Sequence, residues 1–167
     1  MEVNYDDWVK TVPVEIIGDS LWKVEAYRIS LLANDIGWYD VTKLTSDRRM
    51  VGLSDQLYRA LGSICANIAE GYSRRSGREK ARFYEYALGS VRECRGWYYN
   101  ARHILCEKVI SHRINLLTQI IRLLTTMVPD QRTRTLHEPK SEYLNHPESK
   151  PDDLKEFLDL LQIIPLP

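Results

Sequence analysis

The sequence predicts an all-α protein: an antiparallel, up-down four-helix bundle with a C-terminal tail that carries a short amphipathic helix. Apolar residues recur every three or four positions over the long central stretches, which is the period of one helix face and not of a strand. The two most regular stretches are joined by only about four residues, so they must be antiparallel neighbours. At 167 residues the chain is long enough for one well-buried domain and short for two.

Four regions are expected along the chain. Residues 1–18 form an N-terminal arm, in which the run 12–17 resembles a strand without a visible pairing partner. Residues 19–128 form the four-helix bundle. Residues 129–151 are a polar linker punctuated by proline, and residues 152–164 are a short C-terminal docking helix. An isolated helix of that length is marginal in water, so it should dock in a groove of its own bundle or of a partner.

The first bundle helix is expected from Asp19 or Ser20, as the N-cap, to about residue 44. Gly37 interrupts its apolar stripe and predicts a bend or fray near Trp38. The second helix is expected to begin at Ser54, whose hydroxyl suits an N-cap, and to end at Gly71. One face of this helix is apolar, with Leu57, Leu61, Ile64, Ile68 and Tyr72.

The third helix should begin at Ser76, because Ser76 and Glu79 have the spacing of a capping box. A break is expected near residues 109–112. The fourth helix then follows and is ended by Pro129. Its core row is Ile110, Ile114, Leu117, Ile121, Leu124 and Val128.

A second apolar row runs beside the core row of the fourth helix. It consists of Leu116, Ile120, Leu123 and Met127. A helix that is apolar over so wide an arc is usually buried on two sides, so we expect this row to form the interface with another subunit. The alternative is that the N-terminal arm or the C-terminal tail covers it.

The composition is that of an ordinary globular protein, with 44% hydrophobic residues and a formal net charge of zero. The three cysteines have no C-x-x-C spacing and predict free thiols in a reducing compartment. The acidic N-terminus lacks the apolar core of a signal peptide, and no apolar run approaches the roughly 20 residues that span a bilayer. We therefore expect a cytoplasmic protein without a membrane partner.

The zero net charge hides an uneven distribution. Basic and acidic residues number 4 and 8 in residues 1–44, 16 and 8 in residues 45–134, and 3 and 7 in residues 135–167. Fourteen of the 16 central cations are arginine, the side chain suited to bidentate phosphate or carboxylate contacts. A basic middle between acidic ends favours a polyanionic ligand, which the ends can screen or compete with.

The densest basic cluster lies where the second and third helices meet. The first turn of a helix already carries partial positive charge, so helix propensity would not select cations there, whereas a phosphate ligand would. The nearby Tyr72, Tyr84 and Tyr86 offer stacking, although Tyr84 has a core position. The alternative is that this basic cluster is a solvated loop that binds no ligand. The candidate nucleic-acid-binding residues are Arg74, Arg75, Arg78, Lys80 and Arg82, with Arg48, Arg49 and Arg92 as extensions and Arg95 and Arg102 beyond them.

Signs of catalysis are weak. Glu70 and Glu93 can be read as paired carboxylates that hold a metal for a nuclease, but no third acidic ligand or nucleophile accompanies them. His103, Cys106 and His112 match no zinc-finger spacing, and the chain has no P-loop or nucleophile elbow. We expect no enzyme, catalytic residue, cofactor or metal. The polar residues with structural roles are expected to be Asn67, Glu70, Ser76, Glu79 and Glu93.

Several motifs resemble the four-helix-bundle proteins of 23S rRNA intervening sequences. They are residues 52–60 (GLSDQLYRA), 63–64, 67–74 (NIAEGYSR), Ser76, Glu79 and 87–93 (ALGSVRE), and the likeness spans about residues 21–128. It implies the bundle fold. The same family includes the accessory protein of diversity-generating retroelements, a basic pentamer that binds nucleic acid and a reverse transcriptase. The resemblance therefore implies a homo-oligomer, a pentamer by likeness, with a reverse transcriptase or other effector protein as partner.

Two functions follow from these observations. The first is a non-enzymatic, homo-oligomeric accessory protein that binds RNA or DNA through the corner between helices two and three. The alternative is a protein-protein interaction scaffold whose basic surface and C-terminal helix dock partner proteins. A metal-dependent nuclease has less support than either.

Overall fold

The computed structural model describes residues 2–133 and 151–167, and these are almost wholly helical, which confirms the all-α prediction. Two very short strands pair antiparallel, with Glu2 opposite Pro165 and Val3 opposite Ile164. The elements in order are β1 (Glu2–Val3), α1 (Tyr5–Thr11), α2 (Val14–Ile17), the 3-10 turn η1 (Ser20–Lys23), α3 (Glu25–Leu44), the 3-10 turn η2 (Arg48–Met50), α4 (Val51–Ser73), α5 (Gly77–Ala101), α6 (Glu107–Thr133), α7 (Pro151–Gln162) and β2 (Ile164–Pro165).

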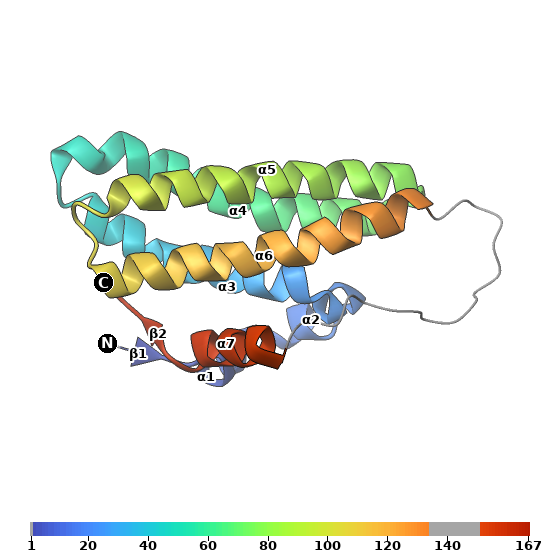
Figure 1. The fold of residues 1–167 in the computed structure, drawn as a ribbon, viewed down its shortest axis with the longest axis horizontal. Helices are drawn as coiled ribbons and strands as arrows, with labels where there is room; N and C mark the ends of the chain where they lie inside the picture. The colour runs from blue at the N-terminus through green and yellow to red at the C-terminus, as the bar shows by residue number, and fades with distance from the viewer. Residues whose placement is uncertain (1, 134–150) are drawn as a thin grey trace.

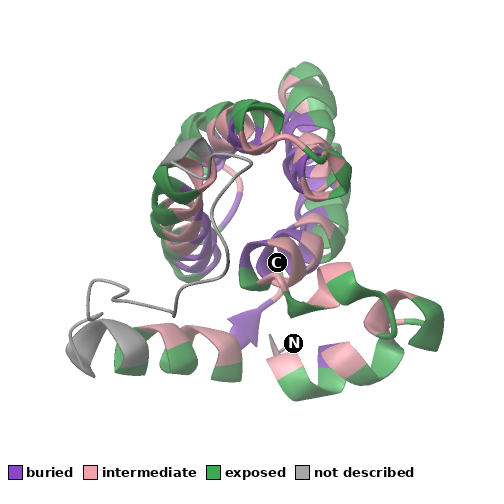
Figure 2. Ribbon diagram, turned by 90° about the vertical axis from the view of Figure 1, so that its right-hand side faces the viewer, coloured by how far each residue is buried: buried purple, intermediate pink, exposed green. Residues whose placement is uncertain are grey.

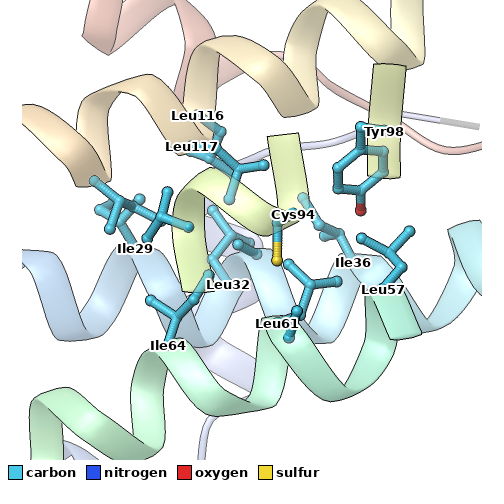
Figure 3. Packing of buried hydrophobic residues seen from close by; sticks show 14 of the residues in the cluster. Ile29, Leu32, Ile36, Leu57, Leu61, Ile64, Cys94, Tyr98, Leu116 and Leu117 are labelled. Carbon is cyan, nitrogen blue, oxygen red and sulfur yellow. The ribbon is translucent and has the colours of Figure 1, made fainter. Parts of the chain in front are cut away.

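The four long helices α3, α4, α5 and α6 lie side by side, joined by short links (Figure 1). Helix α4 packs between α3 and α5, α5 also packs on α6, and α6 contacts α3. Their buried faces turn toward one another (Figure 2). The core between them is aliphatic, with Leu32 of α3, Leu61 of α4, Cys94 of α5 and Leu117 of α6 meeting at its centre (Figure 3).

Helix α3 begins later than predicted and continues without a break through Gly37. Asp19 caps the preceding turn η1 instead, with its carboxylate accepting from the backbone N–H of Leu21 at 2.8 Å. Gly37 is buried, and a Cβ there would overlap the Cδ1 atom of Leu61. The glycine therefore serves the close approach of α3 to α4 and not a break in α3.

Both predicted ends of the second helix are wrong, because tertiary packing uses the residues that resemble caps. Helix α4 begins at Val51, so Ser54 lies within it, where its buried hydroxyl donates to the carbonyl of Met50 at 2.9 Å. The helix continues past Gly71 to Ser73.

The later boundaries also differ from the prediction. The break before the last long helix falls at residues 102–106, and Val109 is fully buried inside α6. Helix α6 passes through Pro129 and continues for another turn to Thr133. Except at its ends, the predicted linker 129–151 lies outside the described residues.

The N-terminal arm is helical and packs on the long helices, and residues 14–17 of the strand-like run form helix α2. Trp8 of α1 is buried, and its indole N–H donates to the Asp35 carboxylate of α3 at 2.8 Å. Trp8 also stacks on Trp22, with ring centroids 6.2 Å apart. Because Trp8 and Ile164 belong to the main hydrophobic cluster, both ends of the chain share one core with the bundle.

The predicted subunit interface is wrong at two of its four positions. Leu116 and Ile120 are fully buried within the chain itself, and Leu123 and Met127 are partly buried against the same core. Helix α7 and strand β2 also pack on α6, where the carbonyls of Leu160 and Pro165 bond His112 and Arg113.

A buried ion pair joins α3 to α6. The Arg113 guanidinium of α6 donates to the Asp40 carboxylate of α3 through Nε at 2.7 Å and Nη2 at 3.1 Å, and the side chains are 1% and 0% exposed. The Tyr98 hydroxyl of α5 donates to the same carboxylate at 2.7 Å. Arg113 Nη2 also donates to the carbonyl of Pro165 at 2.8 Å. The pair therefore connects three long helices to the end of the chain.

His112 extends this network to α7. Its Nδ1 lies 2.8 Å from Arg113 Nη1, and its Nε2 lies 2.9 Å from the carbonyl of Leu160. A guanidinium can only donate and a carbonyl can only accept, so the imidazole is neutral, with its proton on Nε2. Burial, and then the charge of Arg113, lower the pKa of His112 to about 4.

Removing the charge of Asp40 should destabilise the fold strongly. Asp40→Asn keeps the shape of the side chain but leaves the Arg113 charge buried without a counter-charge, so we expect a loss of about 3–5 kcal/mol in the free energy of unfolding in urea. Arg59→Ala is the control, because it breaks the exposed Arg59–Asp55 pair and should cost less than about 1 kcal/mol. Equal losses in the two variants would contradict this account of the buried pair.

The neutral state of His112 should make stability depend on pH. The unfolded histidine titrates near pH 6.5 and the folded one at about 4. The contribution of neutral His112 to the free energy of unfolding is therefore complete above pH 6.5. It is lost as the pH falls toward 4, by up to about 3 kcal/mol. Urea unfolding between pH 7 and 4 should show a flatter profile for His112→Asn than for wild type. The exposed His103→Asn should keep the wild-type slope, and an unchanged slope in His112→Asn would refute the assignment.

Candidate functional site

The corner between α4 and α5 is a three-residue link, residues 74–76, which brings the two helices into close contact. A Cβ at Gly71 would lie 2.8 Å from Tyr84 Cε1 and 3.0 Å from Phe83 Cβ. Glycine at this position therefore allows the first turns of α5 to pack on the last turn of α4. Tyr84 is buried there, as its core position predicts, so it cannot offer a stacking surface.

The structure brings the five principal candidate cations together at this link, and we call them the basic corner: Arg74, Arg75, Arg78, Lys80 and Arg82. Arg74 forms an ion pair with Glu70 one turn earlier, and its guanidinium lies 4.8 Å from the centroid of the Phe83 ring. Arg75 and Arg78 are exposed, and neither makes a hydrogen bond or ion pair with any residue that the structure describes.

Aromatic rings hold the other two cations. The Arg82 guanidinium lies 5.5 Å from the Tyr86 ring centroid, and its Nε donates to the Tyr86 hydroxyl at 2.6 Å. The Lys80 ammonium lies 6.0 Å from the Tyr72 ring centroid. Such contacts leave the positive charge intact, whereas an ion pair would neutralise it. The basic corner therefore keeps most of its charge.

A surface hollow of about 710 Å³ opens beside these residues on the first turns of α5. Arg78, Glu79, Arg82 and Glu85 line it. Its walls thus carry both signs of charge, with donors from two guanidinium groups and acceptors from two carboxylates.

The acidic ends of the chain do not neutralise the basic corner within residues 2–133 and 151–167. Glu70 of α4 is the carboxylate that forms an ion pair with one of its five cations. The terminal segments α1, α7 and β2 lie along the opposite side of the molecule from the α4–α5 link (Figures 1 and 2).

The predicted extensions are not brought to the basic corner. Arg48 and Arg49 precede α4, whose 23 residues span about 35 Å, so they lie near its other end. Asp47 accepts from Arg49 at 3.0 and 2.6 Å. Arg92 is exposed and lies about four turns along α5 from Arg78. These three arginines remain candidate contacts for a long ligand only.

Three of the five predicted structural polar residues, Asn67, Glu70 and Glu93, bond partners, and the partner differs in each case. The Asn67 amide donates to the carbonyl and the hydroxyl of Ser63, at 2.8 and 3.0 Å, and Ser63 bonds Ser90 of α5 at 3.0 Å. This bridge between α4 and α5 was missed, since serines carry no pairing signal in a sequence. Glu93 accepts from the Trp97 indole at 3.1 Å. Ser76 occupies the N-cap of α5, but its side chain makes no capping bond, so the capping-box prediction is wrong.

No three-ligand metal cluster of His, Cys, Asp and Glu occurs among the described residues. Glu70 pairs with Arg74 and Glu93 with Trp97, so the two carboxylates do not face each other as a pair. His112 belongs to the buried network around Arg113. Within the same ranges, no helix is both long and apolar enough to cross a bilayer.

The ring contacts of the basic corner could be found only in part from the sequence. Arg82 and Tyr86 are four residues apart, as are Glu70 and Arg74, which is the spacing of facing side chains on a helix. The contact of Arg74 with Phe83 crosses from the link to α5 and has no such signal.

The model of the 23S rRNA-intervening sequence protein family matches residues 29–126, a span that contains the basic corner. A comparison with curated proteins finds no match.

Gly71→Ala tests the packing that shapes the corner. The added methyl would press on Tyr84 and Phe83, so we expect a loss of about 1–3 kcal/mol in the free energy of unfolding in urea. Gly89→Ala on α5 is the matched control, since a Cβ there meets nothing within 4 Å, and helix propensity predicts a gain of up to about 1 kcal/mol. A neutral or stabilising Gly71→Ala would show that α4 and α5 do not need this close approach.

Proposed function

Because the chain belongs to the 23S rRNA-intervening sequence protein family, we propose that it is a non-enzymatic nucleic-acid-binding protein that contacts RNA or DNA through the basic corner. In this proposal, the four long helices form an antiparallel up-down bundle and the protein acts as a homo-oligomeric accessory factor. By family likeness, the oligomer is a pentamer and the partner is a reverse transcriptase or another effector protein.

The proposal rests on the hydrogen-bond donors of the basic corner that have no acceptor among the described residues. Arg75 and Arg78 have no hydrogen-bonded or ionic partner in the described ranges, and Lys80 and Arg82 rest on aromatic rings. The first backbone N–H groups of α5 point to the same end, and the Ser76 side chain does not cap them. Guanidinium groups and free N–H groups at a helix N-terminus are the donors that bind phosphate.

Repetition of the corner around an oligomer would strengthen this contact. A single corner offers only a few phosphate contacts, whose energy depends steeply on salt. Several corners on one strand would act together, because the second contact becomes intramolecular once the first has formed.

The protein-interaction scaffold has less support. That alternative uses the C-terminal helix as a free docking element, whereas α7 and β2 pack on the chain's own α6. The Leu160 carbonyl accepts from His112, and the Pro165 carbonyl accepts from Arg113. Releasing α7 so that its packed face could bind a partner would require breaking these bonds first.

Charge reversal at the corner should weaken binding. In Arg75→Glu/Arg78→Glu, the two arginines without partners become acidic, so titration of labelled RNA and DNA should give at least about tenfold lower affinity at low salt. The slope of log affinity against log salt should become shallower by about two, one for each lost phosphate contact.

Lys43→Glu/Arg59→Glu is the matched control, with the same change in net charge at exposed residues of α3 and α4 away from the corner. It should change the affinity much less. Equal loss in the two double variants would attribute binding to overall charge, and wild-type binding that is indifferent to salt would overturn the proposed function.

A further inference from the structure

We propose that the basic corner takes single-stranded nucleic acid in preference to duplex, by stacking an unpaired base on the Arg82–Tyr86 platform while Arg75 and Arg78 contact its phosphates. This inference rests on the proposed function and specifies the form of nucleic acid that the site recognises.

The platform is fixed in place before any ligand arrives. Tyr86 is 46% exposed, and its hydroxyl and ring face both contact Arg82. The Phe83 ring meets the Tyr86 ring edge to face, at 5.9 Å between centroids and 90° between planes, and Arg74 covers Phe83 in turn. Planar guanidinium and aromatic groups are the surfaces on which single-stranded bases stack.

The hollow beside the platform suits an unpaired base better than a backbone. Glu79 and Arg82 both line it, and a carboxylate would repel a phosphate. The same carboxylate can accept from the exocyclic amino group of a base. In a duplex, the Watson–Crick edges are already paired and the base faces are stacked on one another. No base is then free to stack on the platform or to donate from its Watson–Crick edge to Glu79.

The distribution of charge also disfavours a duplex. Arg48 and Arg49 lie near the far end of α4 and Arg92 lies about four turns along α5, so these arginines do not extend the cluster at the corner. Glu79 lies between Arg78 and Lys80 in the sequence, and Glu70 pairs with Arg74. A rigid duplex needs a row of phosphate contacts, whereas a flexible strand can place single phosphates on Arg75 and Arg78 and turn its bases inward.

The test measures affinity for labelled oligonucleotides of one sequence, as single-stranded RNA, single-stranded DNA and the corresponding duplexes. We expect wild type to bind the single strands about tenfold more tightly than the duplexes. Tyr86→Leu should lower single-strand affinity about fivefold or more, with little change in duplex affinity or salt slope. Tyr86→Phe keeps the ring and should retain most of the binding. Thermal melting of each variant confirms folding.

Tyr99→Leu is the matched control. Tyr99 is also exposed on α5, and the Arg102 guanidinium lies 3.9 Å from its ring centroid, but it is 13 residues further along the helix than Tyr86. This variant should bind like wild type. The RNA and DNA arms identify the sugar that the site accepts, and tighter binding of either single strand than of its duplex supports the inference.

The two proposals fail in different ways. Equal affinity for single strands and duplexes, or equal losses in Tyr86→Leu and Tyr99→Leu, would overturn the single-strand inference. If Arg75→Glu/Arg78→Glu still weakened binding in that case, the proposed function would stand. Absence of binding to all four ligands would overturn the proposed function and this inference with it.

Discussion

The buried ion pair between Asp40 and Arg113 is the interaction on which the rest of the structure depends. Removing both charges from water carries a penalty that is offset only when every donor and acceptor finds a partner. Tyr98 and the Pro165 carbonyl supply two of those partners, so the pair is satisfied only when α3, α5, α6 and β2 are all in place. It therefore fixes helix register and the path of the C-terminus together.

That constraint also separates the charges of a chain whose net charge is zero. Because β2 is tied to Arg113 and paired with β1, both terminal segments lie on the side of α3 and α6 (Figure 1). The α4–α5 link faces away from them. Because the terminal helices α1 and α7 lie away from the link, the arginines at residues 74–82 keep a positive field of their own, even though the net charge of the chain is zero.

Sequence periodicity predicted the long helices but not the details that packing decides. Each of the four long helices has an apolar stripe, and such stripes persist whatever they pack against. In the sequence, Ser54 and Gly71 resemble helix caps. In the structure, the Ser54 hydroxyl bonds within its own helix, and the missing side chain of Gly71 leaves room for Tyr84. A strand of two residues is too short to show a periodic pattern. The sequence alone suggests that Arg113 is exposed, because its counter-charge lies 73 residues earlier and meets it only in the folded chain.

At the candidate site, the cations and the nearby Tyr72 and Tyr86 could be predicted from the sequence, whereas the contact of Arg74 with Phe83 could not. The kind of partner that holds each cation matters physically. A carboxylate partner would orient an arginine and cancel its charge, whereas a ring face orients it and leaves the charge in place. Arg74 has both kinds of partner, while the partner of Arg82 within the described part of the chain is Tyr86. Side chains held in this way lose less conformational entropy when a polyanion arrives. The ring contacts thus make a charged surface also a preorganised one.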